Sequence, residues 1–119
     1  MALFRRRNAP PLESSGDAAD DALLQQIAKR SDLTRPRHWL HYVYFAGEDG
    51  ARAAAGEAKA AGWTLQTVDV AATGDGWVVI AEQHGVVLTP SRVAEARDFF
   101  QGLAARHAGG DYDGWEASL

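Results

Sequence analysis

The sequence predicts an α+β domain in which two helices cover one face of an antiparallel sheet. Segments with strand and helix patterns follow one another in the order β-α-β-β-α over residues 38–108, which is the order of a split β-α-β unit. The turn signal Gly74-Asp75-Gly76 lies between the second and third strands and indicates an antiparallel hairpin. A chain of 119 residues can bury about two-thirds of its surface, which is enough for one core without disulfides.

A further helix is predicted before this unit, beginning at Asp17, a residue type favoured at the N-cap. Ala19, Leu23 and Ile27 recur at i, i+4 and i+8 and form one apolar face. Pro36 disfavours helix at the residue before it, so the helix ends earlier. We expect this helix to cover either an edge or the open face of the sheet.

The first strand and the second helix are predicted from side-chain type and spacing. His38 to Phe45 is rich in aromatic and β-branched residues, as strands are. Both faces of this segment are largely apolar, so we expect a central strand. Residues 48–61 predict a helix, because alanines recur at i, i+3, i+4 and i+7 and Gly62 follows at the C′ position.

The remaining elements complete the unit. Residues 63–70 and 77–84 predict the hairpin strands, and Thr89-Pro90 begins a helix that extends through Ala108 before Gly109-Gly110. Residues 111–119 predict a short edge strand or a docked tail. This order is that of the ferredoxin-like fold, which hosts unrelated functions and does not decide activity.

The charge distribution favours a basic partner. The net charge is −4, and three of the 12 basic residues are Arg5, Arg6 and Arg7. We expect residues 1–16 to form a flexible tail and residues 17–119 a single domain. That domain has 9 basic and 15 acidic residues and a charge of −6. An acidic surface repels phosphate backbones and attracts basic proteins.

The sequence predicts a cytoplasmic protein, because residues 1–11 contain no apolar signal-peptide core and no stretch approaches the length of a membrane span. There is no cysteine for a disulfide, a thiol nucleophile or a Cys-ligated zinc site.

No catalytic motif is found. His38 and His41 are three residues apart and point to opposite faces of a regular strand. An acylphosphatase, which shares the predicted fold, needs an asparagine, and the only one is Asn8 in the tail. We therefore predict no enzyme activity, no metal site and no cofactor, with structural roles for the histidines His38, His41, His84 and His107.

Direct RNA binding through the open face of the sheet is the alternative. Tyr42, Tyr44 and Trp77 could stack on bases as in RNA-recognition modules. The third strand lacks the basic residue and paired aromatics of that module, and the acidic charge opposes RNA.

The C-terminal segment Gly109 to Glu116 combines two aromatic and three acidic residues. Tyr and Trp supply contact area at interfaces, and carboxylates select basic partners. The alternative, equally open from the residues alone, is that Trp115 packs into the core and Asp113 caps a turn.

This segment, Gly-Gly-Asp-Tyr-Asp-Gly-Trp-Glu, resembles the C-terminal signature of the regulator of ribonuclease activity B family, the ribonuclease E inhibitors. The resemblance covers about residues 17–119, although Lys29-Arg30-Ser31 stands where the family more often has a glycine. Other matching segments occur in the same order: Asp20 with Leu23-Leu24, residues 32–37, Tyr44-Phe45, Ala61-Gly62-Trp63, Gly76-Trp77 and Ala81-Glu82.

The resemblance implies a small cytoplasmic protein of ferredoxin-like fold that binds the C-terminal scaffold half of ribonuclease E and lowers its cleavage of RNA. We expect the aromatic residues to anchor the partner and the carboxylates to steer it. The predicted contacts are Asp111, Tyr112, Asp113, Trp115 and Glu116, with Asp20 and Asp21 as secondary contacts.

Overall fold

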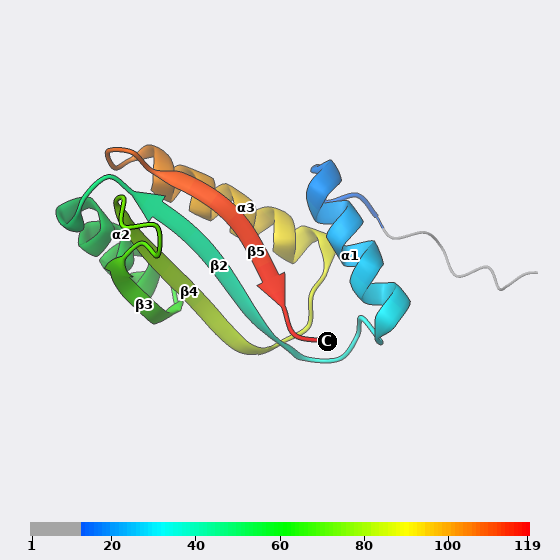
Figure 1. The fold of residues 1–119 in the computed structure, drawn as a ribbon. Coiled ribbons are helices and arrows are strands. Elements are labelled where there is room, and N and C mark those ends of the chain that lie inside the picture. Colours follow the sequence, from blue (N-terminus) through cyan, green and yellow to red (C-terminus); the bar gives the residue numbers. More distant parts are fainter. Residues whose placement is uncertain (1–12) are drawn as a thin grey trace, which may run out of the picture.

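The computed structural model describes residues 13–119 and contains a four-stranded antiparallel sheet with three helices in that part of the chain (Figure 1). The α+β class is confirmed. The elements, in chain order, are α1 (Ala18–Arg30), β2 (Arg37–Phe45), α2 (Glu48–Ala60), β3 (Thr64–Val70), β4 (Trp77–Val86), α3 (Pro90–Ala105) and β5 (Asp111–Ala117).

The strand order is β3-β4-β2-β5, and each neighbouring pair is antiparallel. The segment predicted to be a central strand, β2, lies between β4 and β5. The C-terminal segment is an edge strand, as the sequence predicted for one of two alternatives. Residues 1–12 of the predicted tail lie outside the described residues.

Helices α2 and α3 pack on one face of the sheet, and α1 lies where α3 begins and β5 ends (Figure 1). Leu24 and Ile27 of α1 are buried in the same core as the sheet residues. Helix α1 therefore extends the helix layer at the β5 edge, and no helix of the described residues covers the opposite face, which we call the open face.

Two predicted N-caps are confirmed. The Asp17 carboxylate accepts a hydrogen bond from the Asp20 amide at 2.9 Å. The Thr89 hydroxyl accepts one from the Arg92 amide at 3.1 Å, with Pro90 in the first turn. Such caps satisfy amides that have no partner within the helix.

Helix α3 ends at Ala105, three residues before the predicted end. The chain turns at Arg106, and the carbonyl of Ala108 accepts a hydrogen bond from the Ala46 amide at 3.0 Å. This hydrogen bond to the β2–α2 connection takes the place of a last helical turn. Side-chain periodicity could not reveal such a long-range bond.

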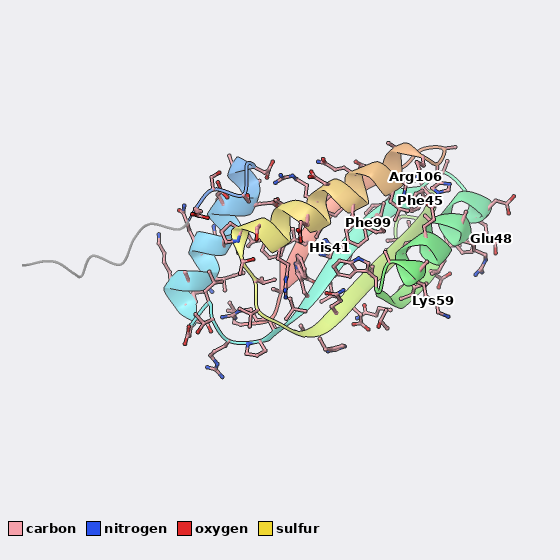
Figure 2. All side chains as sticks on the ribbon, turned by 180° about the vertical axis from the view of Figure 1, so that it is seen from behind. His41, Phe45, Glu48, Lys59, Phe99 and Arg106 are labelled. Carbon is pink, nitrogen blue, oxygen red and sulfur yellow. The ribbon has the colours of Figure 1, made fainter. Side chains whose placement is uncertain are left out.

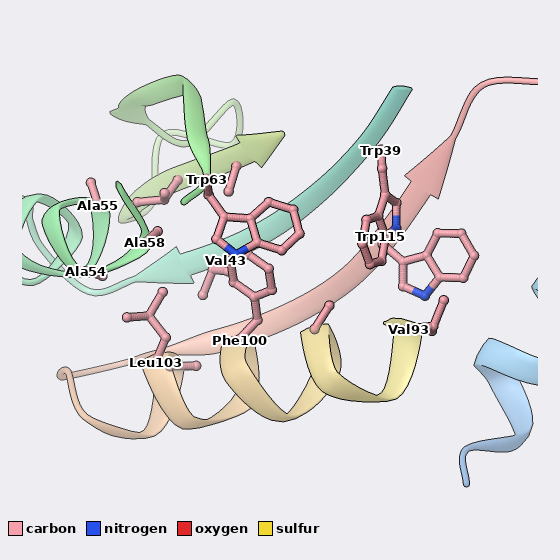
Figure 3. Close-up of a cluster of buried hydrophobic side chains, with 14 of the residues drawn as sticks. Trp39, Val43, Ala54, Ala55, Ala58, Trp63, Val93, Phe100, Leu103 and Trp115 are labelled. Carbon is pink, nitrogen blue, oxygen red and sulfur yellow. The ribbon is translucent and has the colours of Figure 1, made fainter. Parts of the chain in front are cut away.

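The core lies between the sheet and the helices (Figure 3). Phe100 of α3 is fully buried against the rings of His41 and Trp63. Helix α2 contributes only small side chains to the core, which let it approach the sheet closely; they are Ala51, Ala54, Ala55 and Ala58.

Among residues 13–119, none of the helices has both the length and the apolar character needed to span a membrane.

Candidate functional site

The predicted contact segment forms β5, and a bulge decides which way its side chains point. Tyr112 pairs with Val43 and Trp115 pairs with His41. Two residues of β5, one of them Gly114 with φ of 96°, therefore stand opposite Tyr42. In a regular strand, side chains three residues apart face opposite sides. The extra residue reverses this, so both aromatic rings point to the helix layer.

Tyr112 is bound inside the domain. Its hydroxyl makes a 2.8 Å hydrogen bond with Nδ1 of His41, and its ring stacks on Phe100 at 5.6 Å between centroids. Burial raises the pKa of Tyr112 and lowers that of His41 to about 3. Both groups are therefore neutral near pH 7. Figure 2 shows His41 pointing from β2 toward the helix side.

Trp115 joins β5 to α1 and α3. Its side chain is buried, and its indole N–H donates to Oδ1 of Asp20 at 2.9 Å. The other oxygen of Asp20 lies 3.0 Å from Nη1 of Arg97. Trp115 also packs edge-to-face against Trp39. Asp20 is thus engaged within the domain by a hydrogen bond and an ion pair.

Asp21 holds the segment before α1. Its carboxylate accepts hydrogen bonds from the Ser14 hydroxyl at 2.7 Å and from the Ser15 amide and hydroxyl at 2.8 and 2.6 Å. These bonds, mainly those from Ser15, lower the pKa of Asp21. The structure therefore brings Asp20 to Trp115 but gives Asp21 a separate, local set of partners.

The carboxylates of β5 are the accessible part of the motif. Asp111, Asp113 and Glu116 are all exposed. Glu116 accepts a hydrogen bond from the Tyr42 hydroxyl on the open face, which raises the pKa of Tyr42 to about 12. The motif is thus divided, with acidic groups facing solvent and aromatic rings facing the core.

Sequence reasoning missed a groove of about 300 Å³ between α1 and the end of β5. Trp115 forms part of its wall, so the buried ring still reaches a surface depression. Leu23 and Ile27 of α1 were recognised as an apolar face, but nothing in their spacing shows that this face is left partly uncovered. The groove is lined by Leu23, Gln26, Ile27, Arg30, Trp115, Glu116, Ala117 and Leu119.

Arg37 fixes the chain end beside this groove. It is buried, and its Nη1 donates to the carbonyls of Ser118 at 2.9 Å and Leu119 at 3.2 Å. Its Nη2 donates to the Ser31 hydroxyl at 3.1 Å and to the Asp32 carbonyl. The sequence offered no signal that this arginine binds the C-terminal carbonyls.

The aromatic set considered for RNA does not share one face. Tyr42 and Tyr44 are half-buried on the open face, beside Val78 and Ile80 of β4. Trp77 pairs with Phe45 and lies on the helix side, with the Arg52 guanidinium 5.4 Å from its ring. Placing Trp77 with the two tyrosines was wrong, because position 77 has the opposite strand parity to 78 and 80.

Fold and site together define a small α+β domain whose distinctive surface is an acidic edge strand beside a groove lined by both apolar and polar side chains. The family model for regulator of ribonuclease activity B matches residues 17–117. The chain therefore belongs to the regulator of ribonuclease activity B family. A search of curated proteins finds no match.

Proposed function

We propose that this protein binds ribonuclease E, inhibits it, and so modulates RNA processing and decay in the cytoplasm. The family match over residues 17–117 carries this proposal. The charge of −6 on residues 17–119 supports it, because RNA-binding segments of a nuclease are basic. Regulation would require contact with the C-terminal scaffold half of the nuclease and no chemistry on RNA.

The arrangement that presents this surface is, we propose, a ferredoxin-like split β-α-β sandwich preceded by an extra helix. The strand order β3-β4-β2-β5 supports this, since α2 and α3 each connect strands across an intervening one. That topology places the last strand at an edge, where a partner can approach it from the side.

The proposed contact surface consists of the exposed carboxylates Asp111, Asp113 and Glu116 on β5. Tyr112 and Trp115 hold this strand on the core, and the groove beside Trp115 accepts an apolar side chain of the partner. A basic segment with an apolar anchor meets both features. Asp20 supports the surface by joining α1 to Trp115 of β5, whereas Asp21 holds the segment before α1.

Calorimetric titration of the protein into the host's ribonuclease E tests the function. Full-length nuclease should bind and be inhibited, while nuclease that lacks its C-terminal half should show neither effect. Absence of heat and of inhibition with both forms would overturn the proposal. Inhibition of the nuclease that lacks its C-terminal half would support the inhibitory function but would refute the C-terminal half as the binding site.

A charge-neutral variant tests the site. Asp111→Asn with Asp113→Asn and Glu116→Gln should weaken binding about tenfold, since exposed charge pairs contribute about 0.2–1 kcal/mol each. Binding should also depend less on salt. The matched control removes three other exposed carboxylates, with Asp49→Asn, Glu95→Gln and Asp98→Asn. Equal weakening in both triple variants would show that net charge, not β5, attracts the partner.

Direct RNA binding is tested with the same samples. Tyr42 and Tyr44 present two rings on the open face, but Glu116 accepts a hydrogen bond from Tyr42. Asp111 on the neighbouring strand β5 and Asp69 on β3 add negative charge to the sheet. Labelled RNA without nuclease should therefore remain unshifted at about 0.15 M salt, where exposed charges are screened over roughly 8 Å. A shift lost in Tyr42→Ala and Tyr44→Ala would favour the RNA alternative.

A further inference from the structure

Three potential metal ligands, none of them part of the acidic motif of β5, converge on the open face. His38 lies on β2, and Glu82 and His84 lie two residues apart on β4, so all three side chains share a face. Nε2 of His38 is 2.6 Å and Nε2 of His84 is 3.5 Å from the same oxygen, Oε1 of Glu82. One ligand atom from each residue lies within 4.8 Å of the others.

We propose that His38, Glu82 and His84 bind a divalent transition-metal ion, with Zn²⁺ the best match. Two imidazole nitrogens and a carboxylate oxygen are common zinc ligands, and a water molecule completes a tetrahedral site. This proposal departs from the sequence prediction of no metal site and of structural roles for His38 and His84. It does not depend on ribonuclease binding.

The spacing of the ligand atoms is close to what zinc requires. Ligands about 2.0–2.1 Å from a tetrahedral zinc ion stand about 3.3 Å apart. The His84–Glu82 separation of 3.5 Å meets this value, and the His38–Glu82 separation of 2.6 Å must open by about 0.7 Å. Zinc would then replace the direct contact between His38 and Glu82.

One ring must turn for the ion to bind. The rings of His38 and His84 stack at 4.0 Å with only 5° between their planes, and lone pairs of parallel stacked rings do not meet at one point. The His84 side chain is 68% exposed, whereas that of Glu82 is 13% exposed. His84 is therefore free to tilt out of the stack toward an ion held by the other two residues.

A neighbouring side chain orients the carboxylate. Nε2 of Gln66 on β3 donates a hydrogen bond to Oε1 of Glu82 at 3.1 Å. Such outer partners fix the ligands of metal sites, and their removal commonly lowers affinity 10- to 100-fold. The proposed ion would join β2 to β4, with β3 supplying the outer partner.

Calorimetry of the metal-free full chain with zinc chloride tests the site. We expect one ion per chain, and at least tenfold weaker binding in His84→Gln and in Glu82→Gln. The matched control is His107→Gln. Nε2 of His107 also lies 2.6 Å from a glutamate oxygen, that of Glu57. The other side chain that contacts Glu57 is Arg106, which cannot bind a metal ion. This control should bind zinc as the unchanged protein does.

Thermal unfolding gives a second readout that does not depend on heats of binding. Excess zinc should raise the melting temperature of the unchanged protein and of His107→Gln, because a ligand that binds only the folded state stabilises it. At the same zinc concentration it should raise the melting temperature of His84→Gln by a smaller amount. The proposal is overturned if zinc produces no heat with the unchanged protein, or if His84→Gln and His107→Gln weaken binding equally.

Discussion

Replacing Trp115 by phenylalanine separates the role of this ring in the fold from a role in binding. The change removes the indole N–H that donates to Asp20 at 2.9 Å. A hydrogen bond to a charged group contributes about 1.5–3 kcal/mol. The smaller ring also buries about 40 Å² less, or about 1 kcal/mol. We expect the free energy of unfolding to fall by about 3 kcal/mol and the melting temperature by about 12 °C.

The control is Trp63→Phe. Trp63 and Trp115 are each 8% exposed, but the structure shows no hydrogen bond from the Trp63 indole among the described residues. This control should lose only about 1 kcal/mol.

Urea unfolding of Trp115→Phe, Asp20→Ala and the double variant measures the bond directly. The coupling energy between the two positions should exceed about 1 kcal/mol. Additive losses, with coupling below about 0.5 kcal/mol, would refute the assignment of the Trp115–Asp20 bond as a stabilising contact.

Three further predictions concern stability alone. Burial lowers the pKa of His41 from 6.5 to about 3, so between these pH values unfolding takes up a proton and the free energy of unfolding falls by about 1.4 kcal/mol per pH unit on acidification. In urea titrations from pH 6 to 4, His41→Gln should lack this part of the slope, and equal slopes would contradict the burial argument. Gly56→Ala, on the exposed side of α2 with open space for a methyl group, should raise the free energy of unfolding in urea by about 0.5–1 kcal/mol. Gly110→Ala would drive Cβ into the backbone carbonyl of Ala104 and should therefore lower the melting temperature. A melting temperature near that of the unchanged protein would show this close approach to be unimportant.

The element types could be predicted from the sequence because local signals agreed with the tertiary structure. Alanines at helical spacing mark α2, and Thr89-Pro90 marks the start of α3. The end of α3 could not be predicted, because the bond between Ala46 and Ala108 joins residues 62 positions apart. Periodicity reports on neighbours in a helix and carries no information on such pairs.

The orientation of the candidate site could be predicted only in part. The sequence drew attention to the acidic and aromatic residues of β5 but left open whether Trp115 faces a partner or the core. The answer depends on the bulge at Gly114, since the same residues in regular strand geometry would place Tyr112 and Trp115 on opposite faces. The position of the bulge is set by how β5 pairs with β2, and the sequence of β5 alone does not reveal this pairing.

This bulge also explains how one short strand contributes to stability while presenting the proposed contact surface. Tyr112 and Trp115, turned inward, bond His41 and Asp20, and these bonds fix the backbone that carries the outward carboxylates. A surface held in place before binding loses less conformational freedom when a partner docks. Neutralising Asp111, Asp113 and Glu116 should therefore alter affinity with little change in stability, whereas Trp115→Phe should lower stability first. Loss of affinity in Trp115→Phe at temperatures where it stays folded would show that the ring also contacts the partner through the groove.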